Sequence, residues 1–218
     1  AGREVTLAIL AHTPCGREGG PRVKTSLLFS SYPFITGEKV TLSGITQLDP
    51  LVLWPILSDE DSHRFTPEAA LRSPEECTLR ARQYEANFRR GRGLVLGIFS
   101  NEHKLVGLLG ITRVDPQVSC VTLDFILHPR YTGQGFASAA VRACTGYLFQ
   151  RVDVRRIQCL VLPHNRRATL VLERCGFVKE GTIREGFYWP DKGIVDCVLY
   201  SLLPTDLRPK KAGPVYYL

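Results

Sequence analysis

The chain has 218 residues, of which 44% are hydrophobic and 22% are charged, and its formal net charge is +7. This composition is typical of a folded globular protein and excludes a disordered chain. No apolar run reaches the roughly 18 residues that cross a bilayer, so we expect a cytoplasmic protein with no membrane contact. The length suits one large domain, or one domain with extensions.

Seven cysteines occur singly, without a Cys-x-x-Cys pair and without histidines at metal-ligand spacing. Most of them lie inside apolar patterns, which indicates small buried thiols in a reducing compartment. Cys175 lies near the site predicted below, and we interpret it as helix packing. We expect no metal.

The positive charge indicates either nucleic acid or a polyanionic small ligand as the partner. The densest arginine cluster comprises Arg151, Arg155, Arg156, Arg166, Arg167 and Arg174. Aromatic residues are not interleaved with these arginines, as they are in proteins that bind single strands. A local phosphate site therefore explains the cluster better, and nucleic acid is disfavoured as a partner.

In the first half of the chain, residues 1–35 include the Gly- and Pro-rich stretch HTPCGREGGPR and are interpreted as an extension or linker. Alternation in KVTLSGI predicts a strand over 39–45, and residues 48–57 are predicted to be helical. A second helix is predicted to start at Thr66-Pro67-Glu68.

The clearest helix signal is SPEE, which predicts Ser73 as the N-cap and Pro74 at the first helical position. The apolar residues after this signal recur at helical spacing, and they are Cys77, Ala81, Tyr84 and Phe88. The run ends at Arg90-Gly91.

In the second half, strands are predicted at 94–100, 104–113 and 119–128, a helix at 135–151 and a strand at 155–162. A short helix follows at 165–175, ended by Gly176, and two strands at 177–190 and 194–203 complete a domain over 36–205. Residues 206–218 form a basic tail. This order predicts an α+β fold with a mixed, mostly antiparallel central sheet flanked by helices. A crossover helix makes the strands at 119–128 and 155–162 parallel.

The stretch HPRYTGQGFASAA, His128 to Ala140, places two glycines between a strand end and a helix start. The backbone amides of 132–137 can point outward together there, and the helix N-terminus adds partial positive charge. This arrangement suits a pyrophosphate, although a tight turn with glycines for geometry alone remains an alternative. A dinucleotide-binding Rossmann motif fits less well because Ser138 replaces its third glycine, and a Walker P-loop is excluded because no Lys-Ser/Thr pair follows.

Arg130-Tyr-Thr-Gly133-Gln-Gly135 resembles the Arg/Gln-x-x-Gly-x-Gly/Ala motif of the GCN5-related N-acetyltransferases, the GNAT superfamily. Residues 165–203, NRRATLVLERCGFVKEGTIREGFYWPDKGIVDCVLYSLL, resemble the RimJ/RimL branch of that superfamily almost throughout. The resemblance covers roughly Thr36 to Leu203.

The resemblance implies bound acetyl-CoA or another acyl-CoA, with the pyrophosphate on the loop amides and the pantetheine arm along a strand that splays from its parallel neighbour. Asn165 would contact that arm, cap the following helix, or do both. Arg130, Arg167 and Arg174 are candidates for the phosphates. The cofactor-binding residues so implied are Phe125, Ile126, Leu127, Arg130, Tyr131, Thr132, Gly133, Gln134, Gly135, Phe136, Ala137, Asn165, Arg167 and Arg174.

The resemblance further implies direct attack of a neutral amine on the thioester, but two usual polar residues are missing. The serine of the family's Asn-x-x-Ser motif is Ala168 here, and a glutamate of some ribosomal members is Phe187. Candidate bases are Asp124, Glu185 and His128, and candidate proton donors are Tyr188 and Thr169. Asp124 could instead be a hydrogen-bonded strand residue, and Glu185 could pair with Arg184.

We therefore expect an N-acyltransferase that moves an acetyl or other short acyl group from acyl-CoA to a primary amine. The acceptor could be a protein N-terminus, an amino acid conjugate or a small amine, and a homodimer stays open. The acidic stretch Asp59-Glu60-Asp61 could attract a cationic acceptor or simply begin a solvated helix. The alternatives are an acyl-CoA sensor or partner-docking protein of the same fold, and an RNA-associated protein.

Overall fold

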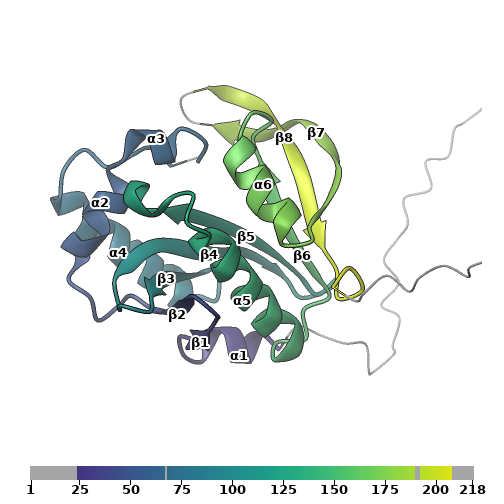
Figure 1. Ribbon diagram of the computed structural model, residues 1–218, viewed down its shortest axis with the longest axis horizontal. Helices are drawn as coiled ribbons and strands as arrows, with labels where there is room; N and C mark the ends of the chain where they lie inside the picture. Colours follow the sequence, from purple (N-terminus) through teal and green to yellow (C-terminus); the bar gives the residue numbers. More distant parts are fainter. Residues whose placement is uncertain (1–23, 67, 190–191, 208–218) are drawn as a thin grey trace, which may run out of the picture.

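An eight-stranded sheet forms the centre of the protein, with the strand order β1-β2-β3-β4-β5-β6-β8-β7 (Figure 1). The computed structural model describes residues 24–207, except residues 67 and 190–191. The strands are β1 (Ile35–Thr36), β2 (Val40–Gly44), β3 (Leu94–Ser100), β4 (Leu105–Asp115), β5 (Cys120–Leu127), β6 (Arg156–Val161), β7 (Val178–Trp189) and β8 (Gly193–Leu202). Neighbouring strands are antiparallel except β5 and β6, which are parallel, as the predicted crossover requires.

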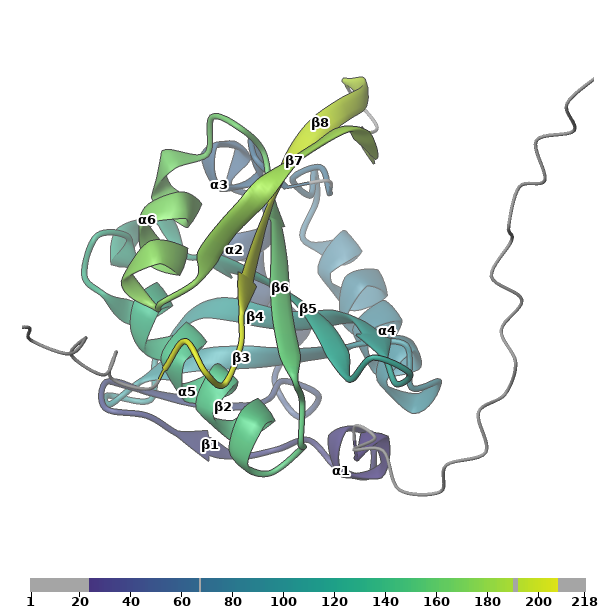
Figure 2. The same ribbon diagram turned by 90° about the vertical axis from the view of Figure 1, so that its right-hand side faces the viewer.

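Helices cover both faces of the sheet. They are α1 (Thr25–Phe29), the 3₁₀ turns η1 (Pro50–Leu53) and η2 (Pro129–Tyr131), and the α-helices α2 (Trp54–Leu57), α3 (Glu60–His63), α4 (Glu75–Arg89), α5 (Phe136–Gln150) and α6 (Arg166–Arg174). Figure 2 shows α5 and α6 on one side of the sheet and α4 on the other. Helix α5 is the crossover between the parallel strands. The predicted α+β class and mixed sheet are confirmed.

Two apolar cores lie on these two faces. The larger one contains Ala140 and Leu148 of α5, which pack with Leu109 and Leu123 of the sheet. The smaller one includes Ile56, Cys77 and Leu108, and Tyr84 of α4 packs against it. Six of the cysteines lie in the described residues and all six are buried, as predicted. Cys15 lies outside the described residues.

Most predicted elements are found within one or two residues, but the helix start predicted at residues 66–68 is wrong. The hydroxyl of Thr66 donates to the carbonyl oxygens of His63 and Glu68, at 3.3 and 2.9 Å, and so closes a turn after α3. Pro74 rather than Ser73 occupies the N-cap position of α4, one residue later than predicted, and it makes no side-chain cap. The carbonyl of Ser73 accepts from the Glu76 amide.

Residues 24–36 pack onto the rest of the fold. Leu28 of α1 is fully buried, and Ile35 is 7% exposed. The Tyr32 ring stacks on Phe88 of α4, with 4.0 Å between centroids. The domain boundary at residue 35 stays a prediction. Most of the predicted extension (1–23) and tail (208–218) lies outside the described residues.

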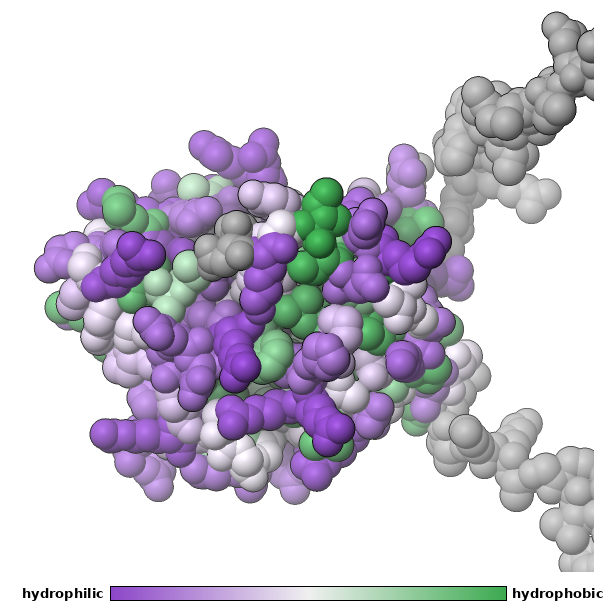
Figure 3. All heavy atoms as spheres, turned by 90° about the horizontal axis from the view of Figure 1, so that it is seen from above, coloured by the Kyte–Doolittle hydropathy of each residue, from purple (hydrophilic) through white to green (hydrophobic). Residues whose placement is uncertain are grey.

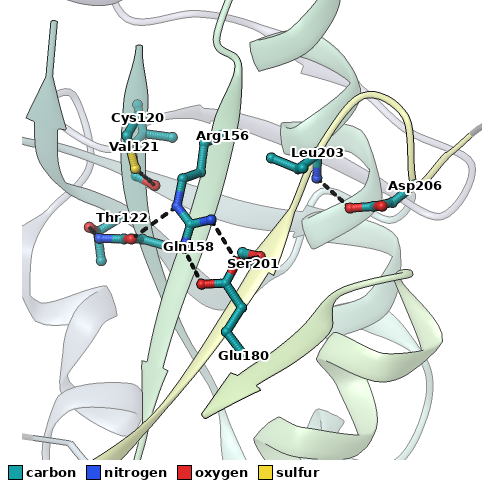
Figure 4. A network of polar contacts seen from close by, with 9 residues as sticks. All are labelled: Cys120, Val121, Thr122, Arg156, Gln158, Glu180, Ser201, Leu203 and Asp206. Carbon is teal, nitrogen blue, oxygen red and sulfur yellow. Dashed lines mark hydrogen bonds and ion pairs between the residues drawn. The ribbon is translucent and has the colours of Figure 1, made fainter. Parts of the chain in front are cut away.

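A polar network on the sheet joins β5, β6, β7 and β8 (Figure 4). The Arg156 guanidinium donates two hydrogen bonds to the Glu180 carboxylate, at 2.7 and 2.6 Å. The hydroxyl of Ser201 donates to the same carboxylate at 2.6 Å. Gln158 accepts from Arg156 Nε at 3.4 Å and donates to Thr122 Oγ1 at 3.1 Å. The network therefore ties the C-terminal strands to β5.

Candidate active site

The loop between β5 and α5 has the geometry that its glycines predict. Gly133 and Gly135 adopt φ angles of +75° and +85°, which L-residues with side chains rarely adopt. Two side chains hold the loop: Thr132 Oγ1 donates to the Pro129 carbonyl at 2.9 Å, and Gln134 Nε2 donates to the Arg130 carbonyl at 2.7 Å. Gly135 is also the left-handed residue at which α5 begins.

The amides of residues 133–138 donate no hydrogen bond to any acceptor within the described part of the chain. By contrast, the Tyr131 amide donates to the His128 carbonyl, and the Thr132 amide donates to the Pro129 carbonyl. A β-carbon built on Gly133 or on Gly135 would meet no atom within 4 Å. A row of unpaired donors therefore lies at the positive end of a helix, where no atom crowds the two glycines, and this is an arrangement that binds anions.

Strands β5 and β6 pair only over three residues each, from Cys120 with Arg156 to Thr122 with Gln158. Beyond that point β5 stays paired with β4 through Leu127 and has no strand on its other edge among the described residues. The predicted splay of the parallel strands is therefore present. Phe125, Ile126 and Leu127 lie along this free edge and are half-buried.

A cavity of about 730 Å³ occupies the gap between the two strands. On the side of α5 and α6 its walls include Gly133, Gly135 and Ala137. On the side of α4 they include Leu57, Tyr84 and Leu108, residues of the smaller apolar core or packed against it. The cavity therefore reaches from one face of the sheet to the other, and two molecules could meet inside it.

Asp124 lies on the cavity wall just beyond the point of strand separation. Its carboxylate fits over β4 because Gly110, its partner across the strands, has no side chain. A β-carbon there would lie 2.1 Å from Asp124 Oδ1. The carboxylate is open to the cavity but enclosed by protein, and this desolvation raises the pKa of Asp124 to about 6, against a smaller lowering by a hydrogen bond from the Gly110 amide.

Further wall residues come from segments for which the sequence predicted no site role. Tyr84 of α4 was predicted only as part of an apolar stripe, and burial raises its pKa. His63 of α3 is 7% exposed, and burial lowers its pKa. Arg92 follows the end of α4 and lines the same cavity. For these wall residues, the sequence signal is the apolar periodicity of α4, which does not distinguish a residue in the core from a residue on a cavity wall.

The other predicted residues fall into two groups. The first group lines the cavity and comprises Asp124, Phe125, Ile126, Leu127, Thr132, Gly133, Gly135, Ala137, Asn165, Arg167, Ala168 and Arg174. Asn165 is also a helix cap, because its Oδ1 accepts from the Ala168 amide at 3.1 Å. The second group belongs to the loop but lies outside the cavity walls, and it comprises Arg130, Tyr131, Gln134 and Phe136.

Glu185 and Tyr188 lie on β7, outside these walls, and stay predictions. The Glu185 amide donates to Asp196 Oδ1 at 2.8 Å, and Tyr188 is 68% exposed. Two residues of the acidic stretch have different surroundings. Asp59 begins helix α3, because its carboxylate accepts from the Ser62 amide at 2.7 Å, whereas Asp61 lines the cavity.

The end of the molecule that carries α6 and the β7–β8 hairpin exposes several apolar side chains, which are Leu170, Ile183, Tyr188 and Ile194. Figure 3 looks at the molecule from above and shows apolar atoms gathered amid a mostly hydrophilic face. Leu170 also lines the cavity, so part of this apolar surface borders it.

Within the described ranges, no group of three or more His, Cys, Asp or Glu side chains could hold a metal ion. No helix in the same ranges is long and apolar enough to cross a membrane.

Comparison with known proteins places the chain in a family. The family model described as "Acetyltransferase (GNAT) domain" matches residues 39–178. The uncharacterized N-acetyltransferase YoaA of Bacillus subtilis is 23% identical over 158 residues, which cover 72% of this chain and 89% of YoaA. The [ribosomal protein uS5]-alanine N-acetyltransferase of Escherichia coli is 24% identical over 157 residues, which cover 69% of this chain and 80% of that enzyme.

Solved structures share the fold. The structure of Mycobacterium smegmatis RimJ in complex with CoA-disulfide matches with a TM-score of 0.70 at 20% identity, over 81% of this chain and 90% of RimJ. The resemblance predicted from residues 130–135 and 165–203, including its RimJ/RimL-like branch, is thereby confirmed. With a family model that matches most of its length and a sheet that splays between β5 and β6, this chain belongs to the GNAT family of acetyltransferases.

Proposed function

We propose that the protein transfers an acetyl group from acetyl-CoA to a primary amine that binds on the α4 side of the cavity. The observation that carries the proposal is the row of unpaired amides at residues 133–138, because four of these residues line a cavity that crosses the sheet: Gly133, Gly135, Ala137 and Ser138. The solved RimJ of M. smegmatis, which has the same fold, is in complex with CoA-disulfide.

The residues present fit the coenzyme. The amides of 133–138 would hold its pyrophosphate, and Arg167 and Arg174 on the cavity wall supply positive charge for its phosphates. The free edge of β5 from Phe125 to Leu127 offers backbone groups to the amides of the pantetheine arm. When bound, acetyl-CoA supplies an activated thioester.

Asp124 is the base in this proposal. With a pKa of about 6 it is a carboxylate at neutral pH, yet it is basic enough to accept a proton from an ammonium group that enters the cavity. The neutral nitrogen then attacks the thioester carbonyl, so that a C–N bond forms and the C–S bond breaks. The ammonium proton goes to the Asp124 carboxylate, and a second proton leaves the nitrogen as the amide forms, which balances the proton that the departing sulfur takes up.

The departing sulfur needs a proton, and Tyr84 is the candidate that the structure adds to the predicted Tyr188. Its phenol lies on the cavity wall, and burial raises its pKa, so it stays protonated at neutral pH and can donate. Its location on the same α4 side as Asp124 puts an acid and a base beside one cavity.

Acceptors range from a protein N-terminus to an amino acid conjugate or a small amine. One relative is named as a ribosomal protein uS5 alanine N-acetyltransferase. Another relative, from Vibrio cholerae, is a spermidine N(1)-acetyltransferase, 28% identical over 87 residues. An acceptor screen should therefore contain both peptides with a free N-terminus and polyamines.

The test is release of free thiol from acetyl-CoA in the presence of a panel of amines, combined with a thermal-shift titration of acetyl-CoA. A ligand at one hundred times its dissociation constant stabilises a protein by about 2.7 kcal/mol. We expect a shift and amine-dependent thiol release. A shift without release for any amine would favour the sensor alternative, which Ala168 and Phe187 motivate, and no shift with any acyl-CoA would refute the proposal.

A further inference from the structure

Arg92 stands at one end of the α4 side of the cavity, where its backbone is held by the end of a helix. Helix α4 ends at Arg89 with Arg90 as its C-cap, and Gly91 turns the chain with a φ of +64°. The Arg92 amide donates to the Asn87 carbonyl at 2.9 Å. Asn87 and Arg92 both line the cavity. The position of Arg92 at the wall is thus fixed by the way α4 terminates.

The Arg92 guanidinium makes no ion pair or hydrogen bond with any residue that the structure describes. Arg80, one of the other arginines of this region, is different because it pairs with Glu68, itself a cavity residue. A guanidinium has five donors in a fixed fork that fits carboxylates and phosphates. Arg92 is exposed and lines the cavity, so its guanidinium is free to bind an anionic group at the cavity wall.

Sheet register gives the spacing between this cation and the base. Val95 of β3 pairs with Gly110 of β4, and Gly110 pairs with Asp124 of β5. Arg92 lies two residues before β3 begins and precedes Val95 by three residues, so it is at most about 10 Å further along the strand direction. Two strand spacings of about 4.8 Å each also separate β3 from β5 sideways. The α-carbons of Arg92 and Asp124 are thus at most about 14 Å apart, and the long arginine side chain can shorten the distance that an acceptor must span.

We infer that the acceptor is a primary amine that carries an anionic group within about 14 Å of its nitrogen, and that Arg92 binds this group. The inference rests on the proposed function and names its substrate class. A short peptide with a free carboxyl end fits, because three residues of extended chain span about 10 Å. A polyamine fits poorly, because its second cation would approach Arg92.

The experiment compares acceptors that differ only in the anionic group. Purified protein with acetyl-CoA receives trialanine, trialanine amide or spermidine, and kcat/KM is measured by thiol release. We expect trialanine to be used about tenfold better than its amide, as for one charge-assisted hydrogen bond, and better than spermidine. Arg92→Gln should remove this preference. Arg90→Gln, a change at an exposed residue outside the cavity walls, should preserve it.

The outcomes separate this inference from the proposed function. Equal use of trialanine and its amide by the unchanged protein, or acetylation of spermidine but not of trialanine, overturns the inference and leaves the acetyltransferase proposal standing. A preference for the free acid that persists in Arg92→Gln overturns the assignment to Arg92. Absence of thiol release with every amine overturns the proposed function and the inference together.

Discussion

Gln158 Nε2 donates a 3.1 Å hydrogen bond to Thr122 Oγ1, and these two residues are the last pair of β5 and β6 before the strands separate. On β5, Asp124 lies two residues beyond Thr122. Because side chains alternate along a strand, Thr122 and Asp124 point to the same side of the sheet. The bond therefore anchors β5 immediately before the candidate base.

Thr122→Val removes the hydroxyl but keeps the shape of the side chain. We expect kcat/KM for acetyl-CoA to fall about fivefold, because a net hydrogen bond of about 1 kcal/mol no longer anchors the strands where they separate. Thr122→Ser keeps the hydroxyl and should stay within about twofold of the unchanged protein. A loss in Thr122→Ser as large as the loss in Thr122→Val would show that the hydroxyl does not explain the effect.

Gly135→Ala should weaken acetyl-CoA binding. Gly135 has a φ of +85°, so a β-carbon costs about 1 kcal/mol or more of backbone strain and displaces the amides at the start of α5. A thermal-shift titration with acetyl-CoA measures the dissociation constant. Gly146→Ala is the matched control: it lies within α5, its β-carbon meets no atom within 4 Å, and alanine should stabilise the helix by about 0.5–1 kcal/mol. Unchanged affinity in Gly135→Ala would count against the pyrophosphate site.

The rate of acetyl transfer should fall as the pH drops below about 6. Burial raises the pKa of Asp124 to about 6, so its carboxylate is protonated below that pH and cannot accept the ammonium proton. A profile of kcat/KM from pH 5 to 8 measures this acidic limb, which is the range in which the rate falls as the pH drops. Asp124→Asn should lower the rate by roughly 10²- to 10⁴-fold and abolish the limb. A variant that retains the limb would show that another group produces it.

Asp124→Asn should also stabilise the fold at neutral pH. The pKa of Asp124 is higher in the folded protein than its ordinary value of 3.8, so the folded state binds more protons between these values and loses stability as the pH rises through about 6. The amide side chain of the variant does not titrate, so the stability of the variant lacks this pH dependence. Urea unfolding at pH 5 and pH 8 should show the greater gain for the variant at pH 8, and a variant less stable than its parent at pH 8 would contradict the burial argument.

Glu180→Gln tests the network that joins the C-terminal strands. Hydrogen bonds from Arg156 and then Ser201 lower the pKa of Glu180 to about 2, below its ordinary 4.5. This stabilisation is present above about pH 4.5 and is lost as the pH falls toward 2. The pair is partly exposed, so we expect a loss of about 1 kcal/mol at pH 7, or about 2–4 °C in Tm. The Tm difference should shrink at pH 3.5, and a constant difference would refute the charge-based cause.

The sequence predicts the part of the site whose residues are close together in the chain. The glycine loop and the strand before it are contiguous over residues 125–137, and positive φ angles and helix starts have short-range signals. Asp124 is a candidate base because the family's usual serine and glutamate are replaced by Ala168 and Phe187. Its position over Gly110, however, depends on the register between β4 and β5.

The α4 side of the cavity could not be predicted in the same way. His63, Tyr84 and Arg92 come from three segments that meet only after the sheet has formed. Tyr84 lies on the apolar stripe of its helix, and such a stripe has the same period whether it faces a solid core or a cavity. The failed helix start at Thr66 has a related cause, because its hydroxyl closes a turn instead.

The close approach of Gly110 to Asp124 links two positions that lie on different strands. A relative that has any larger residue at the position of Gly110 cannot keep a carboxylate in the place where this protein has one. Evolution should therefore change the two positions together. Homologues with glycine at the position of Gly110 and an acid at the position of Asp124 should use a base on β5. The remaining homologues must take their base from another element.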